Sequence, residues 1–142
     1  MKKILLIDND TALCSQLAEA LSAHGYQVCC AHSAVAGRQL ALREKPDAII
    51  TEAMLETDTA GFELVYQIRD ERADSRYRDI RHTPILLLTG IDQHTHFRFS
   101  LNEKQSYLPP IAGMLSKPAQ LDTLLAKLES MLAEAPSNTL SG

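Results

Sequence analysis

The chain has 142 residues, a length usual for a single domain. Its hydrophobic share of 45% and charged share of 23% are ordinary for a globular protein, and the net charge is −4. This acidic balance argues against binding to the phosphate backbone of nucleic acids. The apolar run Ile4–Ile7 is too short to cross a bilayer and the start of the chain lacks a secretory signal pattern, so we expect a cytoplasmic protein.

The first third of the chain alternates between strand and helix patterns. The short apolar run Lys3–Asp8 is typical of a strand buried on both faces of a parallel sheet. Asp10 or Thr11 can cap a helix after it, and Gly25 can end that helix because glycine readily adopts the left-handed conformation. Tyr26–His32 then predicts a second, less hydrophobic strand.

The same alternation continues through the middle of the chain. Ser33 precedes a predicted helix over Ala34–Glu44, which must end before Pro46. Asp47–Glu52 is nearly all apolar until its last residue and predicts a third strand. The polar loop Ala53–Gly61 then leads into a third helix.

The last part of the chain adds two strands and a final helix. We expect the third helix to carry Phe62, Val65, Ile68 and Arg69. Two further strands are predicted at Pro84–Thr89 and Gly113–Ser116, and an amphipathic helix follows, with its apolar stripe from Leu121 to Leu132. Residues 91–112 show no clear period and stay unassigned. Residues 136–142 are small and polar, so we expect one domain over residues 1–135 and a disordered tail.

Strands that alternate with helices through short links predict an α/β protein with a flavodoxin-like, doubly wound, five-stranded parallel sheet in three layers. Sites in such sheets form beyond the carboxyl ends of the strands. The residues at those ends are Asp8, Asn9 and Asp10, then Glu52, Thr89 and Lys117. These groups suit a phosphoryl group held with a divalent cation, because carboxylates bind Mg²⁺ and lysine binds phosphoryl oxygens. The first strand–helix turn lacks the glycines that dinucleotide and nucleoside-triphosphate sites require.

Four segments in this order carry a family resemblance: KILLIDND, PDAIITEAMLETDTAGFEL, PILLLTG and LSKPAQLDTLLAKL. The chain resembles the receiver domain of two-component response regulators over nearly its whole length. The resemblance implies a phosphorelay signalling module rather than an enzyme, with a sensor histidine kinase or a downstream effector protein as partner. It also implies phosphoryl-transfer positions at Glu52, Thr89 and Lys117, and Mg²⁺ ligands from Asp8, Asn9, Glu52 and the backbone carbonyl of Met54.

The chain departs from the receiver pattern at its reactive positions. Glu52 stands where the family has the phospho-accepting Asp, and Asn9 replaces the second member of the acidic pair. Met114 stands at the position that an aromatic switch residue usually holds in the family, and Glu56 stands at a position where a proline is common. Glutamate extends its carboxylate by on the order of 1.5 Å, and a misplacement of about 1 Å can slow a positioned reaction roughly a hundredfold.

We therefore expect a stand-alone, degenerate receiver that acts through protein contacts and binds Mg²⁺ weakly or not at all. The extended Glu52 carboxylate can pair with Lys117 or accept from Thr89. A second interpretation, in which Glu52 still accepts a phosphoryl group poorly, stays open. The aromatic segment Phe97–Pro110 and the exposed side of Leu121–Leu132 are the expected contact region, with a homodimer through residues 97–132 as one use of it.

A Mg²⁺-dependent phosphatase is the alternative function. The run ILLIDNDTAL is similar to the first motif of haloacid-dehalogenase-type phosphatases, with Asp8 as nucleophile and Asp10 as general acid/base. That family needs a further acidic pair downstream of Lys117, where the remaining acids all fall within a helical pattern.

Two smaller features have simpler interpretations. The cysteines Cys14, Cys29 and Cys30 are odd in number without a CxxC spacing, which predicts reduced thiols. The basic run from Arg69 to Arg81 is interleaved with acidic residues, so it predicts a solvated surface with mixed ion pairs rather than a nucleic-acid contact.

Overall fold

The structure is a computed structural model that describes residues 1–90 and 111–134. Its strands are β1 (Lys3–Ile7), β2 (Gln27–Ala31), β3 (Ala48–Thr51), β4 (Ile85–Gly90) and β5 (Gly113–Lys117). Its helices are α1 (Thr11–Ala23), α2 (Ala34–Glu44), α3 (Ala60–Ile68) and α5 (Leu121–Glu134), with a 3₁₀ turn, η1, at Arg78–Ile80.

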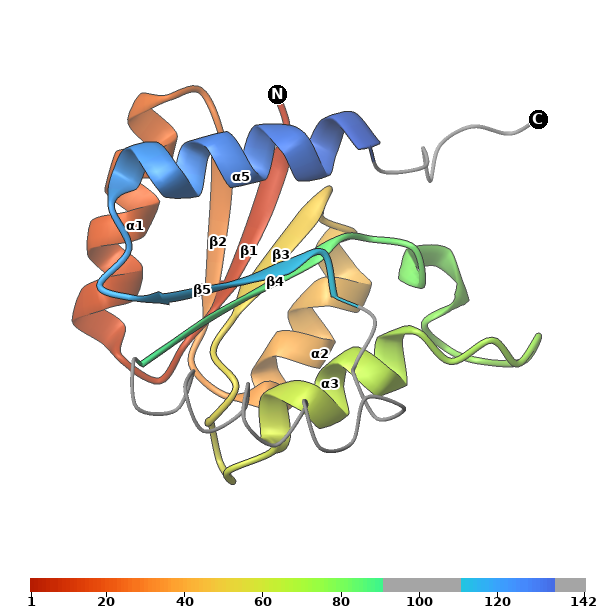
Figure 1. The fold of residues 1–142 in the computed structure, drawn as a ribbon. Coiled ribbons are helices and arrows are strands. Elements are labelled where there is room, and N and C mark those ends of the chain that lie inside the picture. Colours follow the sequence, from red (N-terminus) through yellow and green to blue (C-terminus); the bar gives the residue numbers. More distant parts are fainter. Residues whose placement is uncertain (91–110, 135–142) are drawn as a thin grey trace.

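The five strands form one parallel sheet in the order β2-β1-β3-β4-β5. Helices α1 and α5 cover one face of the sheet, and α2 and α3 cover the other (Figure 1). Two buried clusters result, because alternate residues of each strand point to opposite faces: Leu5 and Ile49 pack under α2 and α3, whereas Leu6 and Ile50 pack under α1 and α5. The predicted doubly wound sheet is confirmed.

Local signals in the sequence account for the ends of α1 and α2. The side chain of Asp10 accepts a hydrogen bond from Leu13 N–H and begins α1, and Gly25, with φ of +91°, follows its end. Ser33 caps α2, and Lys45 follows the last residue of this helix in the left-handed conformation, directly before Pro46.

The third helix begins earlier than predicted. The loop was expected to reach Gly61, but α3 already starts at Ala60 and buries Gly61 in its first turn. The Gly61 N–H donates to the carbonyl of Ala53 at 2.8 Å. A Cβ at Gly61 would lie 2.2 Å from the carbonyl oxygen of Glu52, so only glycine allows this close approach. The first turn of α3 is therefore packed tightly against the backbone of the loop that follows β3.

Two predictions concern segments outside the described residues: the aromatic stretch within residues 91–110 and the tail 136–142. Within the part of the chain that is described, none of the helices has the length and hydrophobicity needed to span a bilayer.

Candidate functional site

The parallel sheet brings three chemically active strand ends together. Asp8 follows β1 and Glu52 follows β3, and these strands pair with Ile7 opposite Thr51. The N–H of Glu52 donates to the Ile7 carbonyl at 2.8 Å, which extends the ladder to the site. On the far side of β4, Lys117 is the last residue of β5 and lies in register with Gly90.

The ammonium group of Lys117 bridges the two carboxylates. Its Nζ donates to Asp8 Oδ2 at 2.6 Å and to Glu52 Oε1 at 3.0 Å. The Asp8 and Glu52 side chains are 9% and 6% exposed, and that of Lys117 is 22% exposed. We call Asp8, Glu52 and Lys117 the carboxylate–ammonium cluster.

The charge of Lys117 is stabilised by its two partners. Burial on its own lowers the pKa of the Lys117 ammonium, but the hydrogen bonds and negative charges of Asp8 and Glu52 outweigh it and raise that pKa above its ordinary value. Lys117 is therefore a permanent cation at neutral pH. The pairing of Glu52 with Lys117 that the sequence suggested is present in the structure.

The second oxygen of Glu52 folds back onto its own loop. Glu52 Oε2 accepts from the backbone N–H of Ala53 at 2.7 Å and lies 3.5 Å from that of Met54. These two amides directly follow the strand, where backbone donors can bind an anion. In this chain the anion that they bind is the Glu52 carboxylate itself.

Asp8 is held from several sides. Its Oδ1 accepts from the Asp10 N–H at 2.9 Å, so both carboxylate oxygens have donors. Its backbone carbonyl accepts from Nδ1 of His32 at 3.0 Å, and Cys14 Sγ lies 3.5 Å from the same oxygen. Burial, together with the nearby Cys30 and Asp8, raises the pKa of the Cys14 thiol to about 12.

The remaining predicted positions lie around the cluster with different exposures. Thr89 is fully buried in β4, opposite Ser116 of β5. Met54 is half-buried and contributes its N–H to the Glu52 carboxylate. Asn9 is exposed beside Asp8, and the Asp10 carboxylate accepts from Leu13 N–H as the cap of α1.

Sequence reasoning missed two residues that contact this region. The sequence predicts His32 as the end of a strand, and it places Glu56 at a position where a proline is common in the family. The structure places His32 against the Asp8 carbonyl and the Glu56 carboxylate against the first turn of α2. No local pattern indicates either contact, because each depends on the side-by-side arrangement of strand ends.

The carboxylate oxygens at this site are poorly arranged as ligands for Mg²⁺. Each carboxylate oxygen of Asp8 and Glu52 already accepts from an N–H or ammonium group, and the cation between them is Lys117. Among residues 1–90 and 111–134, no three His, Cys, Asp or Glu side chains gather as metal ligands. Mg²⁺ needs near-octahedral oxygen ligands, so Lys117 and the Glu52 carboxylate would both have to move to admit it.

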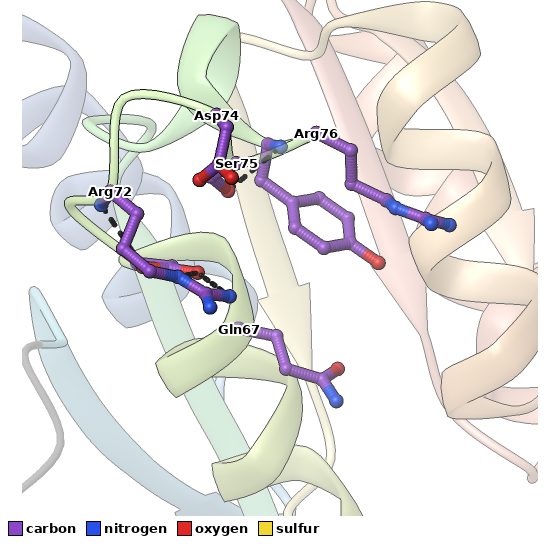
Figure 2. A pocket seen from close by; sticks show the side chains of 7 residues that line it. Gln67, Arg72, Asp74, Ser75 and Arg76 are labelled. Atoms are coloured by element: carbon purple, nitrogen blue, oxygen red, sulfur yellow. Dashed lines mark hydrogen bonds and ion pairs between the residues drawn. The ribbon is translucent and has the colours of Figure 1, made fainter.

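A separate polar hollow of about 460 Å³ lies at the far end of α3 (Figure 2). Its lining includes Gln67, Arg72, Asp74, Ser75 and Arg76. The Arg72 guanidinium is paired with the Asp70 carboxylate at 2.7 Å, and the lining contains both acidic and basic side chains. Because α3 runs back from the carboxyl edge of the sheet, this hollow is remote from the carboxylate–ammonium cluster.

Comparisons with known proteins agree with this fold. The family model described as the response regulator receiver domain matches residues 4–129. Response regulator MprA of Mycobacterium ulcerans is 31% identical over 131 residues, which cover 92% of this chain and 50% of that protein. MprA of Mycobacterium tuberculosis has the same identity and coverage. The chain thus spans about half the length of the curated relatives it matches.

Solved structures are similar over most of the chain. The chemotaxis response regulator CheY4 of Vibrio cholerae is 28% identical, with a TM-score of 0.70, and the match covers 92% of this chain and 98% of that one. A receiver domain protein from Clostridium thermocellum shares the fold at 18% identity, with a TM-score of 0.74 and coverage of 94% and 95%.

The parallel sheet carries two acids, a hydroxyl and a lysine at its carboxyl edge, and its fold is the α/β fold of solved receiver domains. This chain belongs to the response regulator receiver domain family of two-component signalling. Members of this family interact with histidine kinases and effectors, and they bind Mg²⁺ at the phosphorylation site.

Proposed function

We propose that this chain is a receiver domain that signals through protein contacts without phosphorylation at position 52. The observation that carries the proposal is the placement of the Glu52 carboxylate, which takes the Lys117 ammonium with one oxygen and the Ala53 amide with the other. These are the donors that an incoming phosphoryl group would need. The site is thereby saturated by a side chain of the protein itself.

The chemistry of the acceptor supports the same conclusion. In-line phosphoryl transfer requires the nucleophilic oxygen, the phosphorus and the leaving oxygen to lie close to one line. The additional methylene of Glu52 displaces its carboxylate by on the order of 1.5 Å from the position an aspartate would give. Its two oxygens also point to Lys117 and to the backbone of its own loop.

We propose that the Lys117 ammonium group takes the place of Mg²⁺ as the positive charge between the carboxylates of Asp8 and Glu52. Asn9 removes one negative charge beside Asp8, and the remaining two carboxylates are shared by a single ammonium group. We therefore expect Mg²⁺ to bind far more weakly than in a receiver with the full acidic pair. The cluster keeps one state of the domain regardless of the supply of Mg²⁺ or phosphoryl donor.

The proposed partners are a sensor histidine kinase or a downstream effector protein, recognised through the surface of β5 and α5. Helix α5 buries Leu124, Leu128 and Met131 against the sheet and turns its other faces outward. Residues 97–110, which were expected to share this role, lie outside the described residues, and the homodimer through 97–132 stays a proposal.

The test is phosphoryl labelling of the isolated chain. Wild type and Glu52→Asp are incubated with a small phosphoryl donor and Mg²⁺, and intact mass at mildly acidic pH counts the phosphoryl groups. We expect no labelling at position 52 in wild type and measurable labelling in Glu52→Asp. Glu52→Gln is the matched control, because it keeps the length of glutamate and removes the nucleophilic carboxylate.

Peptide mapping decides between the two interpretations of Glu52. Robust wild-type labelling that maps to Glu52 and is lost in Glu52→Gln would overturn the proposal. Labelling of Glu52→Asp shows in addition that Thr89, Lys117 and Asp8 can still support the reaction.

No observation favours the phosphatase alternative over this proposal. Its expected general acid, Asp10, has its carboxylate on the N–H of Leu13, and its expected nucleophile, Asp8, is paired with Lys117. Mg²⁺-dependent hydrolysis of a phosphomonoester that is lost in Asp8→Asn would support the alternative.

A further inference from the structure

Glu56 makes an unusual long-range contact. It belongs to the loop between β3 and α3, yet both its carboxylate oxygens accept from the first turn of α2: Oε1 from Ala34 N–H at 2.7 Å and Oε2 from Val35 N–H at 3.1 Å. Twenty-two residues separate Glu56 from Ala34. The contact therefore joins the β3–α3 loop to the start of α2 at the carboxyl edge of the sheet.

The first turn of α2 explains why a carboxylate fits here. A helix begins with four backbone N–H groups that have no partner within it, and their dipoles favour a negative charge. The side chain of Ser33 accepts from one of them, Ala36 N–H, at 3.1 Å, and the Ser33 carbonyl accepts the first regular helix bond from Gly37 N–H at 2.9 Å. Glu56 supplies acceptors for two more of the four, the N–H groups of Ala34 and Val35.

Both ends of this connection lead to the carboxylate–ammonium cluster. Upstream of α2, His32 contacts the Asp8 carbonyl. Upstream of Glu56, the amides of Ala53 and Met54 hold the Glu52 carboxylate. The contacts form a closed ring that runs from Asp8 through the start of α2 to Glu56, along the loop to Glu52, and back through Lys117.

We propose that Glu56 is a positioning residue that ties the β3–α3 loop to α2 and so holds the Ala53 and Met54 amides on the Glu52 carboxylate. Glu56 does not touch the cluster and acts through the three loop residues between it and Glu52. The inference deepens the proposed function and rests on it, since the position of these amides matters for signalling through the Glu52 carboxylate.

Amide hydrogen exchange, followed by NMR at neutral pH, separates positioning from simple helix capping. In Glu56→Ala we expect exchange to become roughly tenfold faster at Ala34 and Val35 and also at Ala53 and Met54. Ser33→Ala is the matched control, because it removes a hydrogen bond from the same helix end without touching the loop. We expect its effect to stay within the first turn of α2.

The outcomes are distinct. Faster exchange at Ala53 and Met54 in Glu56→Ala but not in Ser33→Ala supports positioning. An effect of Glu56→Ala confined to α2, or equal effects of both variants on the loop, would overturn it and leave Glu56 as a helix cap. If Glu56→Ala does not fold, the same comparison and criteria apply to Glu56→Gln, which keeps one side-chain oxygen as acceptor.

These exchange rates do not depend on whether position 52 is phosphorylated. Labelling of wild type at Glu52 would therefore contradict the proposed function while leaving the exchange result intact. An unchanged loop in Glu56→Ala would contradict only the role of Glu56.

Discussion

The ammonium group of Lys117 lies 3.0 Å from Oε1 of Glu52, although 65 residues separate them in the chain. The contact exists because β4 and β5 carry Lys117 to the same sheet edge at which β3 ends. The Asp8 carboxylate, 2.6 Å from the same nitrogen, completes a cluster with two negative charges and one positive charge. A buried cluster of this kind depends strongly on each member, since removal of one leaves the others unpaired.

Removal of the Lys117 charge should destabilise the domain. In Lys117→Met, the carboxylates of Asp8 and Glu52 face each other without a cation, so we expect the free energy of unfolding to fall by about 3–5 kcal/mol. Urea denaturation followed by circular dichroism measures the change. The matched control is Lys3→Met, whose salt bridge to Glu44 is more exposed and should contribute about 1 kcal/mol or less. Equal losses in the two variants would contradict the assignment of a buried cluster.

The stabilisation by Lys117 should depend on pH in a defined direction. Its pKa in the folded protein is raised above the ordinary value of 10.5, so the folded state binds the Lys117 proton more tightly than the unfolded state. The contribution is fully present below 10.5 and is lost as the pH rises through the folded pKa. We expect the difference in unfolding free energy between wild type and Lys117→Met to be constant around neutral pH and to shrink in strongly alkaline solution. A difference that grows with alkaline pH would contradict this sign.

Gly61 should tolerate no side chain. A Cβ at this position would meet backbone atoms of Glu52 and Ala53, at 2.2 Å from the Glu52 oxygen, and backbone cannot move aside as a flexible side chain can. We expect Gly61→Ala to lower the free energy of unfolding by about 1–3 kcal/mol or more. In the control Gly25→Ala the added methyl meets no atom within 4 Å, and only the positive φ of +91° costs about 1–2 kcal/mol. NMR shifts at Ala53 should change in Gly61→Ala and not in Gly25→Ala.

Cys14 should be chemically inert in the folded protein. Burial, with smaller effects of Cys30 and Asp8, raises its thiol pKa to about 12, and the thiolate is the reactive form. We expect iodoacetamide at pH 8 to leave Cys14 unmodified in native buffer and to alkylate it in denaturant, as peptide mass mapping will show. Rapid native alkylation of Cys14 would contradict its buried position beside the Asp8 carbonyl.

Glu56 should titrate below its ordinary range. Burial opposes its charge, but hydrogen bonds from the Ala34 and Val35 amides and the nearby charge of Arg38 outweigh this and lower the pKa of the Glu56 carboxyl below 4.5. The stabilisation is therefore present above 4.5 and lost as the pH falls through the folded pKa. The amide proton shifts of Ala34 and Val35 should follow this titration with a midpoint below 4.5. A midpoint above that value would contradict a charged contact with α2.

The succession of strands and helices along the chain, and the residues at the strand ends, could be predicted from local patterns alone. Buried strands such as Lys3–Ile7 are nearly continuous apolar runs, and the caps Asp10 and Ser33 each accept from the amide three residues further along the chain. These signals are local, so they can be read without knowing the fold. The general rule for parallel sheets then placed Asp8, Glu52 and Lys117 at one edge.

The pairing of those side chains depends on how the strands and loops are packed together. The two oxygens of Glu52 could have taken several partners, and the choice of Lys117 and Ala53 follows from strand register and from the shape of its loop. The same holds for the contact of Glu56 with α2 and for the start of α3 at Ala60. Each of these features joins groups from different elements or fits the backbone of one element against that of another. The spacing of hydrophobic residues reports only on local structure, so it cannot predict such contacts.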